Sequence, residues 1–453
     1  MPCQFSVTQL VDIIDAIPVN LSDEVVGTLL TGIATDTRTL KPGNLFLALR
    51  GEKFDGHNFI DTAAQKGAIA AITERETGST PKGVPQLQVK DTLRAYQQIA
   101  RWWRDQFDIP VIAVTGSVGK TTTKELIAAV LSTKGNVLKT QANYNNEIGV
   151  PKTLLELGPE HDYAVIEMAM RGIGQIAELT QIARPTVSVI TNVGTAHIGL
   201  LGSEDAIAKA KCELLAEMPS TGVAVLNHDN HRLIETAATV WQGQTLTYGL
   251  EGGDLQGKLV DSQTLEVEGM RFPLPLAGRH NALNYLAALG VAKLLEVDWE
   301  PLTKGLAVEL PSGRSQRYDL PNDIVILDET YNAGLESMIA ALHLLAQTPG
   351  KRHIAVLGTM KELGERSPEF HRQVGETARE LNLDALLVLV DDSEAEAITT
   401  GAMPLQAECF SSHDAVVQRL QEMVESGDRF LFKASRSVGL DRVVNQFRTV
   451  LSA

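Results

Sequence analysis

Short apolar runs alternate with amphipathic patterns along most of this 453-residue chain. An apolar run bounded by glycine, proline or asparagine is typical of a buried strand, whereas apolar residues at helical spacing indicate a helix. In the first part of the chain, this pattern predicts strands at 45–49 and 68–72 and a helix at 60–66 that stops at Gly67. We therefore predict a small α/β domain over residues 1–88.

The alternation becomes regular over residues 89–311, which begin with a predicted helix at 92–107. Helices such as 205–218 are predicted between successive strands. Strands that alternate with helices indicate parallel βαβ units, so this segment predicts a central domain with a parallel sheet. The predicted strands of this domain are 111–114, 163–168, 187–191 and 222–227.

The alternation restarts after Pro311-Ser312-Gly313. A break at proline and glycine followed by new strands is typical of a domain boundary. We therefore predict a third, doubly wound domain over residues 312–453, which makes the chain a three-domain α/β protein. Its predicted strands are 324–327, 353–357, 385–390 and 430–432.

The strand at 111–114 leads directly into a candidate phosphate-binding loop. Glycines in such a loop let backbone N–H groups turn toward phosphate oxygens, Lys120 can reach the outer phosphates, and the Thr121 hydroxyl can bind Mg²⁺. The common form has a glycine where this chain has Val114, so the loop is the shorter T-G-x-x-G-K-T. This segment predicts a protein that uses ATP or GTP. The loop residues are Thr115, Gly116, Ser117, Val118, Gly119, Lys120, Thr121 and Thr122.

Charge and cysteine content narrow the class of protein. The formal net charge of −16 argues against nucleic acid or an anionic membrane as the main partner, although local cations can still hold a nucleotide. Cys3, Cys212 and Cys409 are far apart, which indicates a reduced, cytoplasmic protein without a disulfide framework. We expect no signal peptide, and no apolar stretch approaches the ~20 residues that a membrane span needs.

Polar residues follow several of the predicted strands. Ligands of parallel α/β sheets bind at the carboxyl ends of strands, so Glu167, at the end of strand 163–168, is a candidate Mg²⁺ ligand or else a solvent-facing carboxylate. His197 follows strand 187–191 and could ligate a metal, orient a phosphate or be structural. Asp328 and Asn332 repeat the position of Glu167 in the third domain, and a simple strand-end turn is the alternative.

Four further patterns each allow a functional and a structural interpretation. Lys209 and Lys211 are two positions apart on one helix, so one could face the site while the other is solvated, or both could be solvated. Asn281 could cap the helix at 282–295 or bind a base. Arg314 could neutralise a transferring phosphate or lie on a linker surface. A loop with Asn143, Asn145 and Asn146 is either a ligand-binding loop or a polar turn.

Together these motifs resemble the Mur ligase family, which builds the peptidoglycan precursor, and within it the F-type members. The resemblance covers essentially the whole chain. The N-x-N-N-x-I-G-x-P and Y-N-A motifs are the specific ones, because a phosphate loop alone does not separate this family from other ATPases. The matching segments are D-T-R to F-D-G-H at 36–57, T-G-S-V-G-K-T-T at 115–122, N-Y-N-N-E-I-G-V-P-K-T-L-L at 143–155, A-V-I-E-M at 164–168, A-K-A-K-C-E-L-L at 208–215, G-R-H-N at 278–281, D-E-T-Y-N-A at 328–333, V-L-G-T-M-K-E-L-G-E at 356–365 and K-A-S-R at 433–436.

The resemblance implies a division of labour among the domains. Residues 1–88 would bind a UDP-N-acetylmuramoyl-peptide, residues 89–311 would bind ATP, and the Rossmann-like residues 312–453 would bind D-alanyl-D-alanine. It also implies that ATP phosphorylates the terminal carboxylate of the UDP-MurNAc-tripeptide and that the amine of D-Ala-D-Ala displaces the phosphate to give the pentapeptide. We expect a cytoplasmic, monomeric enzyme that acts on these small molecules with ATP and two Mg²⁺ ions.

Site roles follow from the resemblance position by position. Lys120 would hold the phosphates, Thr121 and Glu167 the first Mg²⁺, and His197 and Lys211 the second. Lys211, chosen over Lys209 because it precedes Cys-Glu-Leu-Leu, would be carbamylated. The remaining assignments are nucleotide contacts at Asn281 and Arg314, substrate contacts at Asp36, Thr37, Arg38, Asn143, Asn145 and Asn146, and a reaction-centre motif with Asp328, Tyr331 and Asn332.

Some positions depart from the family pattern, and two other readings remain. Gly334 stands where asparagine is common, Gln175 where glutamate is expected, and Thr37 where serine is expected. One alternative is another amide ligase, either an amino-acid-adding Mur enzyme or folylpolyglutamate synthetase. The diaminopimelate-adding Mur enzyme would carry a D-N-P-R motif, which is absent here. The other is a nucleotide-binding regulator or inactive scaffold. The third residue of the peptide, meso-diaminopimelate or L-lysine, is left open.

Overall fold

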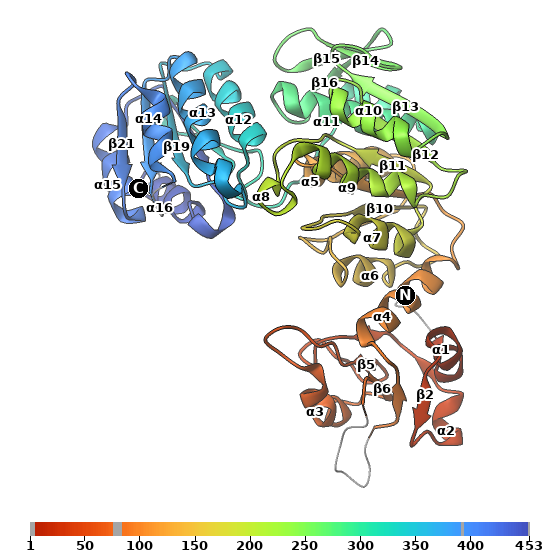
Figure 1. Ribbon diagram of the computed structural model, residues 1–453. Helices are drawn as coiled ribbons and strands as arrows, with labels where there is room; N and C mark the ends of the chain where they lie inside the picture. The colour runs from red at the N-terminus through yellow and green to blue at the C-terminus, as the bar shows by residue number, and fades with distance from the viewer. Residues whose placement is uncertain (1–4, 76–83, 391–393, 452–453) are drawn as a thin grey trace.

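The computed structural model of the chain describes residues 5–75, 84–390 and 394–451. It consists of three α/β domains, each built on one main sheet (Figure 1). The central domain lies between the other two, which extend from it in different directions. The predicted α/β class with three domains is confirmed, while the boundaries near residues 88 and 311 stay predictions.

The N-terminal domain has a five-stranded sheet with the order β2-β7-β6-β5-β4 and a separate pair formed by β1 and β3. The main sheet is parallel except where β2 runs antiparallel to β7. Helix α4 (Thr92–Arg104) then leads into the central domain. The other elements are β1 (Phe5–Ser6), α1 (Val7–Ile14), β2 (Ile17–Val19), α2 (Asp23–Val26), β3 (Leu29–Leu30), β4 (Ile33–Ala34), β5 (Leu45–Leu47), η1 (Gly56–Phe59), α3 (Ile60–Gln65), β6 (Ala70–Thr73) and β7 (Gln86–Gln88).

The central domain has a nine-stranded sheet with the order β16-β15-β14-β13-β12-β11-β8-β10-β9. Strands β9 to β14 and β8 pair in parallel, and β14 to β16 form an antiparallel extension. Its elements are β8 (Val111–Thr115), α5 (Lys120–Leu131), β9 (Val137–Lys139), α6 (Gly149–Leu154), β10 (Tyr163–Glu167), α7 (Gln175–Ala183), β11 (Val187–Ile190), α8 (Ile198–Leu201), α9 (Glu204–Ala216), β12 (Val223–Asn227), α10 (His231–Val240), β13 (Gln244–Gly249), β14 (Leu255–Leu259), β15 (Thr264–Val267), β16 (Met270–Pro273), α11 (Arg279–Leu294) and η2 (Glu300–Lys304).

The inner strands β8, β10 and β11 are buried on both faces, which explains why they read as mostly apolar runs rather than alternating patterns. Ile112 and Val114 of β8 pack into the core with α5 and α11, and Val111 and Ala113 face the core on the opposite side with α7 and α9. Strand β8 therefore lies in the middle of the domain, and the loop after it is held between two layers of helices.

The C-terminal domain has a six-stranded sheet with the order β17-β18-β22-β19-β20-β21, in which only β17 is antiparallel to its neighbour. Helices cover both faces, as a doubly wound fold requires. The elements are β17 (Gln316–Leu320), η3 (Pro321–Asp323), β18 (Ile324–Asp328), α12 (Leu335–Gln347), β19 (Arg352–Gly358), η4 (Gly364–Arg366), α13 (Ser367–Glu380), β20 (Ala385–Leu389), α14 (Glu396–Ala402), β21 (Ala407–Phe410), α15 (His413–Met423), β22 (Asp428–Lys433), η5 (Arg436–Val438) and α16 (Asp441–Leu451).

Two features differ from the sequence-based expectation. The helix predicted at 92–107 ends at Arg104, whose guanidinium donates to the Phe107 carbonyl at 2.9 Å and holds the chain beyond the helix. Phe107 still packs edge-on against Trp103, with ring centroids 5.2 Å apart. Its apolar side chain therefore continues the helical spacing in the sequence although the helix has already ended. The antiparallel strands β14 to β16 were not predicted.

Two further expectations concern the membrane and the cysteines. Within residues 5–75, 84–390 and 394–451, no helix is both long and apolar enough to cross a bilayer. Cys212 is buried and Cys409 is exposed, and both are free thiols, while Cys3 lies outside the described residues. This agrees with the prediction of a chain without a disulfide framework, as far as the described cysteines go.

Candidate active site

The phosphate loop connects β8 to α5 through two glycines with positive φ. A Cβ on Gly116 (φ +154°) would lie 1.9 Å from Thr191 Oγ1, and a Cβ on Gly119 (φ +81°) would lie 2.6 Å from Asn284 Oδ1. The loop backbone is also fastened from outside, because Val118 N–H donates to Asn192 Oδ1 at 3.0 Å and the Thr191 hydroxyl donates to the Val118 carbonyl at 2.6 Å. The loop is thus held in one conformation at the start of a helix, where N–H groups favour an anion.

Lys120 lies at the start of α5 and folds back over the loop. Its ammonium donates to the Gly116 carbonyl at 2.8 Å and to the Ser117 carbonyl at 3.4 Å. Burial lowers the pKa of Lys120, nearby Glu167 opposes that shift, and Arg314 of the C-terminal domain adds to it. Glu167 lies opposite Val114 where β10 pairs with β8, so its carboxylate stands next to the start of the phosphate loop.

Glu167, at the carboxyl end of β10, is buried at 2% exposure. Its Oε1 accepts a hydrogen bond from Asn145 Nδ2 at 2.7 Å, and its backbone N–H donates to Thr140 Oγ1 at 3.0 Å. Its Oε2 is buried without a hydrogen-bond partner among the described residues. A buried carboxylate oxygen without a partner is unfavourable unless a cation or ligand meets it, so this atom indicates a cation site.

His197 and Lys211 lie beside the loop on different elements. His197 (φ +66°) precedes α8, and Lys211 is buried at 2% exposure on α9, whereas Lys209 is exposed. Burial and the charge of Lys120 hold the pKa of Lys211 well below its usual range. Neither a hydrogen bond nor an ion pair reaches the Lys211 ammonium from the part of the chain that the structure describes. The sequence alone left open which lysine faces inward, and the packing of α9 decides it.

The C-terminal domain touches this region through two carboxylates. Glu362 Oε2 lies 2.5 Å from His197 Nδ1, and Glu336 at the start of α12 accepts hydrogen bonds from the backbone N–H and hydroxyl of Thr195 at 2.6 and 3.2 Å. Burial and the nearby Lys120 lower the pKa of His197, while Glu362 opposes the shift. These contacts join the central and C-terminal domains at residues 195–197, beside the phosphate loop.

Helix α11 meets the loop through asparagines. Asn281 is buried and its Nδ2 donates to the Ala277 carbonyl at 2.8 Å, so its amide is engaged at the start of α11. Asn284 Nδ2 donates to Asn281 Oδ1 at 3.2 Å, and Asn284 Oδ1 accepts from Thr123 Oγ1 at 3.1 Å. Asn281 therefore acts on the loop through Asn284 in this conformation.

Arg314, Tyr331 and Asn332 come together at the carboxyl end of the C-terminal sheet. The Arg314 guanidinium stacks on the Tyr331 ring at 3.8 Å, and its Nε is buried without a partner among the described residues. The Asn332 carbonyl accepts a hydrogen bond from Lys433 Nζ at 2.9 Å, and burial lowers the pKa of Lys433. Lys433 also lies 3.9 Å from Glu329, so two cationic side chains, Arg314 and Lys433, stand at this end of the sheet together with a carboxylate.

Asp328 is buried beside this group and engaged in its own turn. Its Oδ1 accepts hydrogen bonds from Thr330 N–H at 3.0 Å and from Thr330 Oγ1 at 2.7 Å. Burial raises the pKa of Asp328. The hydrogen bonds of Asp328 are therefore those of a strand-end turn. Its position at the end of β18, close to Tyr331 and Asn332, agrees with the functional interpretation.

The remaining candidates lie apart from the loop or face away from it. Asp36 and Arg38 pair with each other at 2.6 Å in the N-terminal domain, where the hydrogen bonds from Arg38 hold the pKa of Asp36 to about 2, and the Thr37 carbonyl accepts from Lys66 Nζ at 2.8 Å. Of the three asparagines, only Asn145 contacts Glu167. Asn143 is exposed, and Asn146 Oδ1 accepts from the N–H of Gly149, the first residue of α6.

Sequence reasoning missed several residues that build this site. They are polar residues that contact the loop or one of the predicted site residues or their neighbours: Lys124, Thr140, Thr191, Asn192, Asn284, Glu336, Glu362 and Lys433. Asn284 had a detectable signal, because it is a polar residue between Leu283 and Tyr285 in a largely apolar helix. The others depend on contacts between distant segments.

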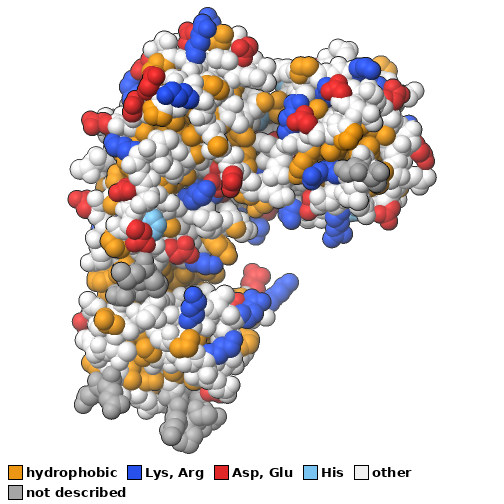
Figure 2. All heavy atoms as spheres, turned by 180° about the vertical axis from the view of Figure 1, so that it is seen from behind, with side chains coloured by type: hydrophobic (Ala, Val, Ile, Leu, Met, Phe, Trp, Pro, Cys, Tyr) orange, Lys and Arg blue, Asp and Glu red, His pale blue; other side chains and the backbone are white. Residues whose placement is uncertain are grey.

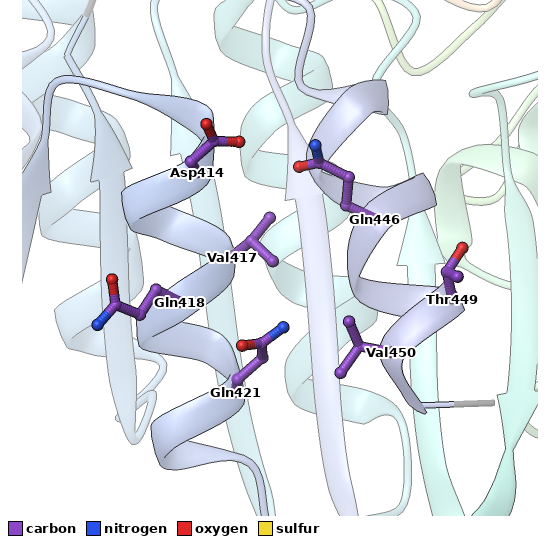
Figure 3. A pocket seen from close by; sticks show the side chains of 7 residues that line it. All are labelled: Asp414, Val417, Gln418, Gln421, Gln446, Thr449 and Val450. Carbon is purple, nitrogen blue, oxygen red and sulfur yellow. The ribbon is translucent and has the colours of Figure 1, made fainter. Parts of the chain in front are cut away.

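The shape of the surface agrees with a site between domains. Seen from behind, the molecule is hollowed between the C-terminal and N-terminal domains (Figure 2). A separate groove between α15 and α16 is lined by Asp414, Thr449, three glutamines and two valines (Figure 3), and none of the predicted site residues borders it. Among the described residues, no three His, Cys, Asp or Glu side chains form a metal cluster, so any cation at Glu167 would take its other ligands from hydroxyls, phosphates or water.

Fold and site together define a three-domain nucleotide-dependent enzyme with a phosphate loop. Comparison with known families then gives a direct result. The Mur ligase middle domain matches residues 114–292, the Mur ligase glutamate ligase domain matches 313–436, and the Mur ligase catalytic domain matches 29–104. The chain belongs to the Mur ligase family, and to its F-type members.

Three relatives illustrate the similarity. A UDP-N-acetylmuramoyl-tripeptide--D-alanyl-D-alanine ligase from Synechocystis sp. is 60% identical over 427 residues, which cover 94% of this chain and 93% of that protein. The crystal structure of MurF from Acinetobacter baumannii has a TM-score of 0.90 at 33% identity and covers 99% of both chains. The MurF ligase from Thermotoga maritima in complex with ADP has a TM-score of 0.83 at 33% identity, covering 92% of this chain and 97% of that one.

Proposed function

We propose that this protein is the ATP-dependent ligase that adds D-alanyl-D-alanine to UDP-N-acetylmuramoyl-tripeptide. The observation that carries the proposal is a phosphate loop with Lys120 folded over it and Glu167 at the end of the neighbouring strand, opposite Val114, in a chain 60% identical to a ligase of that name. The product is the UDP-MurNAc-pentapeptide used for peptidoglycan.

The chemistry follows from the reactants. A carboxylate is a poor electrophile, so its oxygen first attacks the γ-phosphorus of ATP, and ADP leaves to give an acyl phosphate. The amine nitrogen of D-Ala-D-Ala then attacks the acyl carbon, a proton leaves the nitrogen, and inorganic phosphate departs to leave an amide. Two anions must approach each other in the first step, so cationic groups have to surround them.

This chain supplies those groups from two domains. The loop N–H groups and Lys120 bind the phosphates of ATP, and Arg314, held flat on Tyr331, approaches from the C-terminal domain. Lys433, neighbouring Glu329 at 3.9 Å, adds a further cation near the carboxyl end of β18. The Glu336 carboxylate, which accepts from Thr195, and the Glu362 carboxylate, which contacts His197, hold the C-terminal domain against the loop at 194–199.

The site also fits magnesium. Glu167 Oε2, which has no hydrogen-bond partner among residues 5–75, 84–390 and 394–451, and the buried hydroxyl of Thr121 are hard oxygen donors next to the phosphate loop. Mg²⁺ takes such oxygen ligands beside a nucleotide. When bound there, Mg²⁺ would neutralise charge on the phosphates. The residues that would hold a second ion are His197 and Lys211.

Lys211 fits the role of a carbamylated lysine. Its burial and lowered pKa favour the neutral amine. A neutral amine adds to CO₂ by forming an N–C bond and losing a proton, which converts the side chain into an anion. Such an anion would complement the second Mg²⁺ and the neighbouring Lys120.

The domain assignment follows the same logic. We propose that residues 1–88 bind the UDP-sugar end of the acceptor, that residues 89–311 bind ATP, and that residues 312–453 bind D-Ala-D-Ala. The exposed Arg38, Arg50 and Arg75 of the N-terminal domain suit a diphosphate. We also propose that the protein acts in the cytoplasm as a monomer.

The decisive experiment measures ATP-dependent phosphate release with UDP-MurNAc-tripeptide and either D-Ala-D-Ala or a single amino acid. We expect release with the dipeptide only, and a product mass equal to that of the pentapeptide. Release only with a shorter UDP-MurNAc-peptide and one amino acid would assign the chain to another Mur reaction. ATP turnover that does not depend on any carboxylate acceptor would refute ligase function.

A further inference from the structure

Lys124 is a wholly buried lysine that the reaction described above does not use. It lies on α5, one helical turn after Lys120, and is 0% exposed. Its ammonium donates to the Thr140 carbonyl at 2.7 Å and lies 2.8 Å from Glu125 Oε1. Burying a charge is unfavourable without close partners, so the position needs a reason beyond filling space, which an apolar side chain would do better.

Thr140 connects Lys124 to the site. Its N–H donates to the Val165 carbonyl at 3.0 Å, and its hydroxyl accepts the backbone N–H of Glu167 at 3.0 Å. The carbonyl of Thr140 is the group that Lys124 holds. A single residue therefore ties the end of β9 both to the phosphate-loop helix and to the end of β10.

The other end of the same loop also returns to Glu167. Asn145 Nδ2 donates to Glu167 Oε1 at 2.7 Å, and the Ala169 N–H donates to the Asn145 carbonyl at 2.9 Å. Asn145, at the end of the segment that begins at Thr140, thus holds one oxygen of the Glu167 carboxylate, while Oε2 has no hydrogen-bond partner in the part of the chain that the structure describes. Any shift of Thr140 would move both the backbone of Glu167 and the loop that orients its carboxylate.

We propose that Lys124 is a positioning residue for Glu167, acting through Thr140 to aim the free carboxylate oxygen at the nucleotide-bound cation. This rests on the proposed function, in which Glu167 holds Mg²⁺. Lys124 and Lys120 lie on the same helix, α5. This helix therefore positions both Lys120, which binds phosphate, and, through Thr140, Glu167, which binds the cation.

Lys139 provides a matched control. It pairs with the second oxygen of the same carboxylate, Glu125 Oε2, at 2.5 Å, but no hydrogen bond connects it to Thr140 among the described residues. It borders a cavity of about 300 Å³ that Glu125 and Ser132 also line, so water can replace its ammonium. Removing Lys139 perturbs the buried ion pair without releasing Thr140.

The test measures ADP binding by calorimetry over a range of Mg²⁺ concentrations, with thermal stability recorded for each variant. We expect Lys124→Met and Thr140→Val to raise the Mg²⁺ concentration for half-maximal ADP binding by roughly tenfold, the size of one buried hydrogen bond. Thr140→Ser keeps the hydroxyl and Lys139→Met keeps Thr140 in place, so both should match the parent protein. If Lys124→Met does not fold, Thr140→Val tests the second link of the path, the hydroxyl that accepts the Glu167 N–H, and a parental Mg²⁺ dependence in that variant would refute the proposal.

Two outcomes would overturn the proposal in distinguishable ways. A Lys124→Met or Thr140→Val protein that loses thermal stability but keeps the parental Mg²⁺ dependence would show a merely structural role. A Glu167→Gln protein with parental Mg²⁺ dependence would refute the cation assignment itself, and the positioning role would fall with it. Ligase activity of the parent protein tests the proposed function separately.

Discussion

Replacing Gly119 with alanine is a sharp test of how the phosphate loop is held. Gly119 has φ +81°, and an added Cβ would lie 2.6 Å from Asn284 Oδ1. Asn284 cannot simply turn away, because its side chain accepts from Thr123 Oγ1 at 3.1 Å and donates to Asn281 Oδ1 at 3.2 Å. The substitution therefore combines backbone strain with the loss of buried hydrogen bonds.

The expected size of the effect follows from these contacts. Left-handed backbone costs a residue with a Cβ roughly 1 kcal/mol, and each hydrogen bond that Asn284 gives up costs about 1 kcal/mol. We expect a total of about 2–3 kcal/mol. Binding of phosphates requires the loop conformation that the structure shows. If the variant loop leaves that conformation in the absence of nucleotide, the 2–3 kcal/mol is taken from binding, and the affinity for ADP falls by roughly 30- to 150-fold.

The assay is calorimetric binding of ADP with Mg²⁺, paired with chemical denaturation. Gly269→Ala is the control, because Gly269 has φ +79° but no atom within 4 Å of the added Cβ and lies in the turn between β15 and β16. It should lose roughly 1 kcal/mol of stability and bind ADP normally. The reasoning would be refuted if Gly119→Ala behaved like this control. It would also be refuted if Gly119→Ala cost as much in an Asn284→Ala background as in the parent protein, because Asn284→Ala removes the atom that the new Cβ would meet.

Three further outcomes are expected. Lys211→Ala should lose most ligase activity and regain part of it with bicarbonate or short carboxylates, and full activity without additives would exclude the carbamate. Because burial raises the pKa of Asp328, its stabilising contribution is complete below the ordinary value of 3.8 and is lost as pH rises through the raised pKa. Asp328→Asn should therefore melt at a higher temperature than the parent near pH 7, with a difference that narrows toward pH 4. Glu362→Gln removes the charge that meets His197, so small-angle X-ray scattering should show a changed average domain arrangement, and an unchanged curve would contradict a role for this contact.

Much of the fold was accessible from the sequence because its signals are local. A buried parallel strand is a short apolar run, and Val111–Thr115 of β8 is apolar on both faces since helices cover both. Glycine, lysine and threonine in the order of the phosphate loop must lie side by side, because the chain itself connects them. The strand-end positions of Glu167 and Asp328 could be predicted for the same reason.

Other features were hidden because their signal is weak or shared. The short antiparallel strands β14 to β16 carry only a few apolar residues each, and the turn at Gly269 gives little warning of them. The helix at 92–107 was predicted too long, since Phe107 continues the apolar spacing although it packs on Trp103 from outside the helix.

The tertiary structure alone decided how the groups of the site meet. Sequence determined that a phosphate loop, a strand-end carboxylate and two closely spaced lysines exist. It could not determine that Lys211 rather than Lys209 is buried, that Lys124 reaches Thr140, or that Glu362 lies against His197. Such contacts join segments separated by many residues, and their geometry depends on how whole helices and domains pack, which no local pattern along the chain encodes.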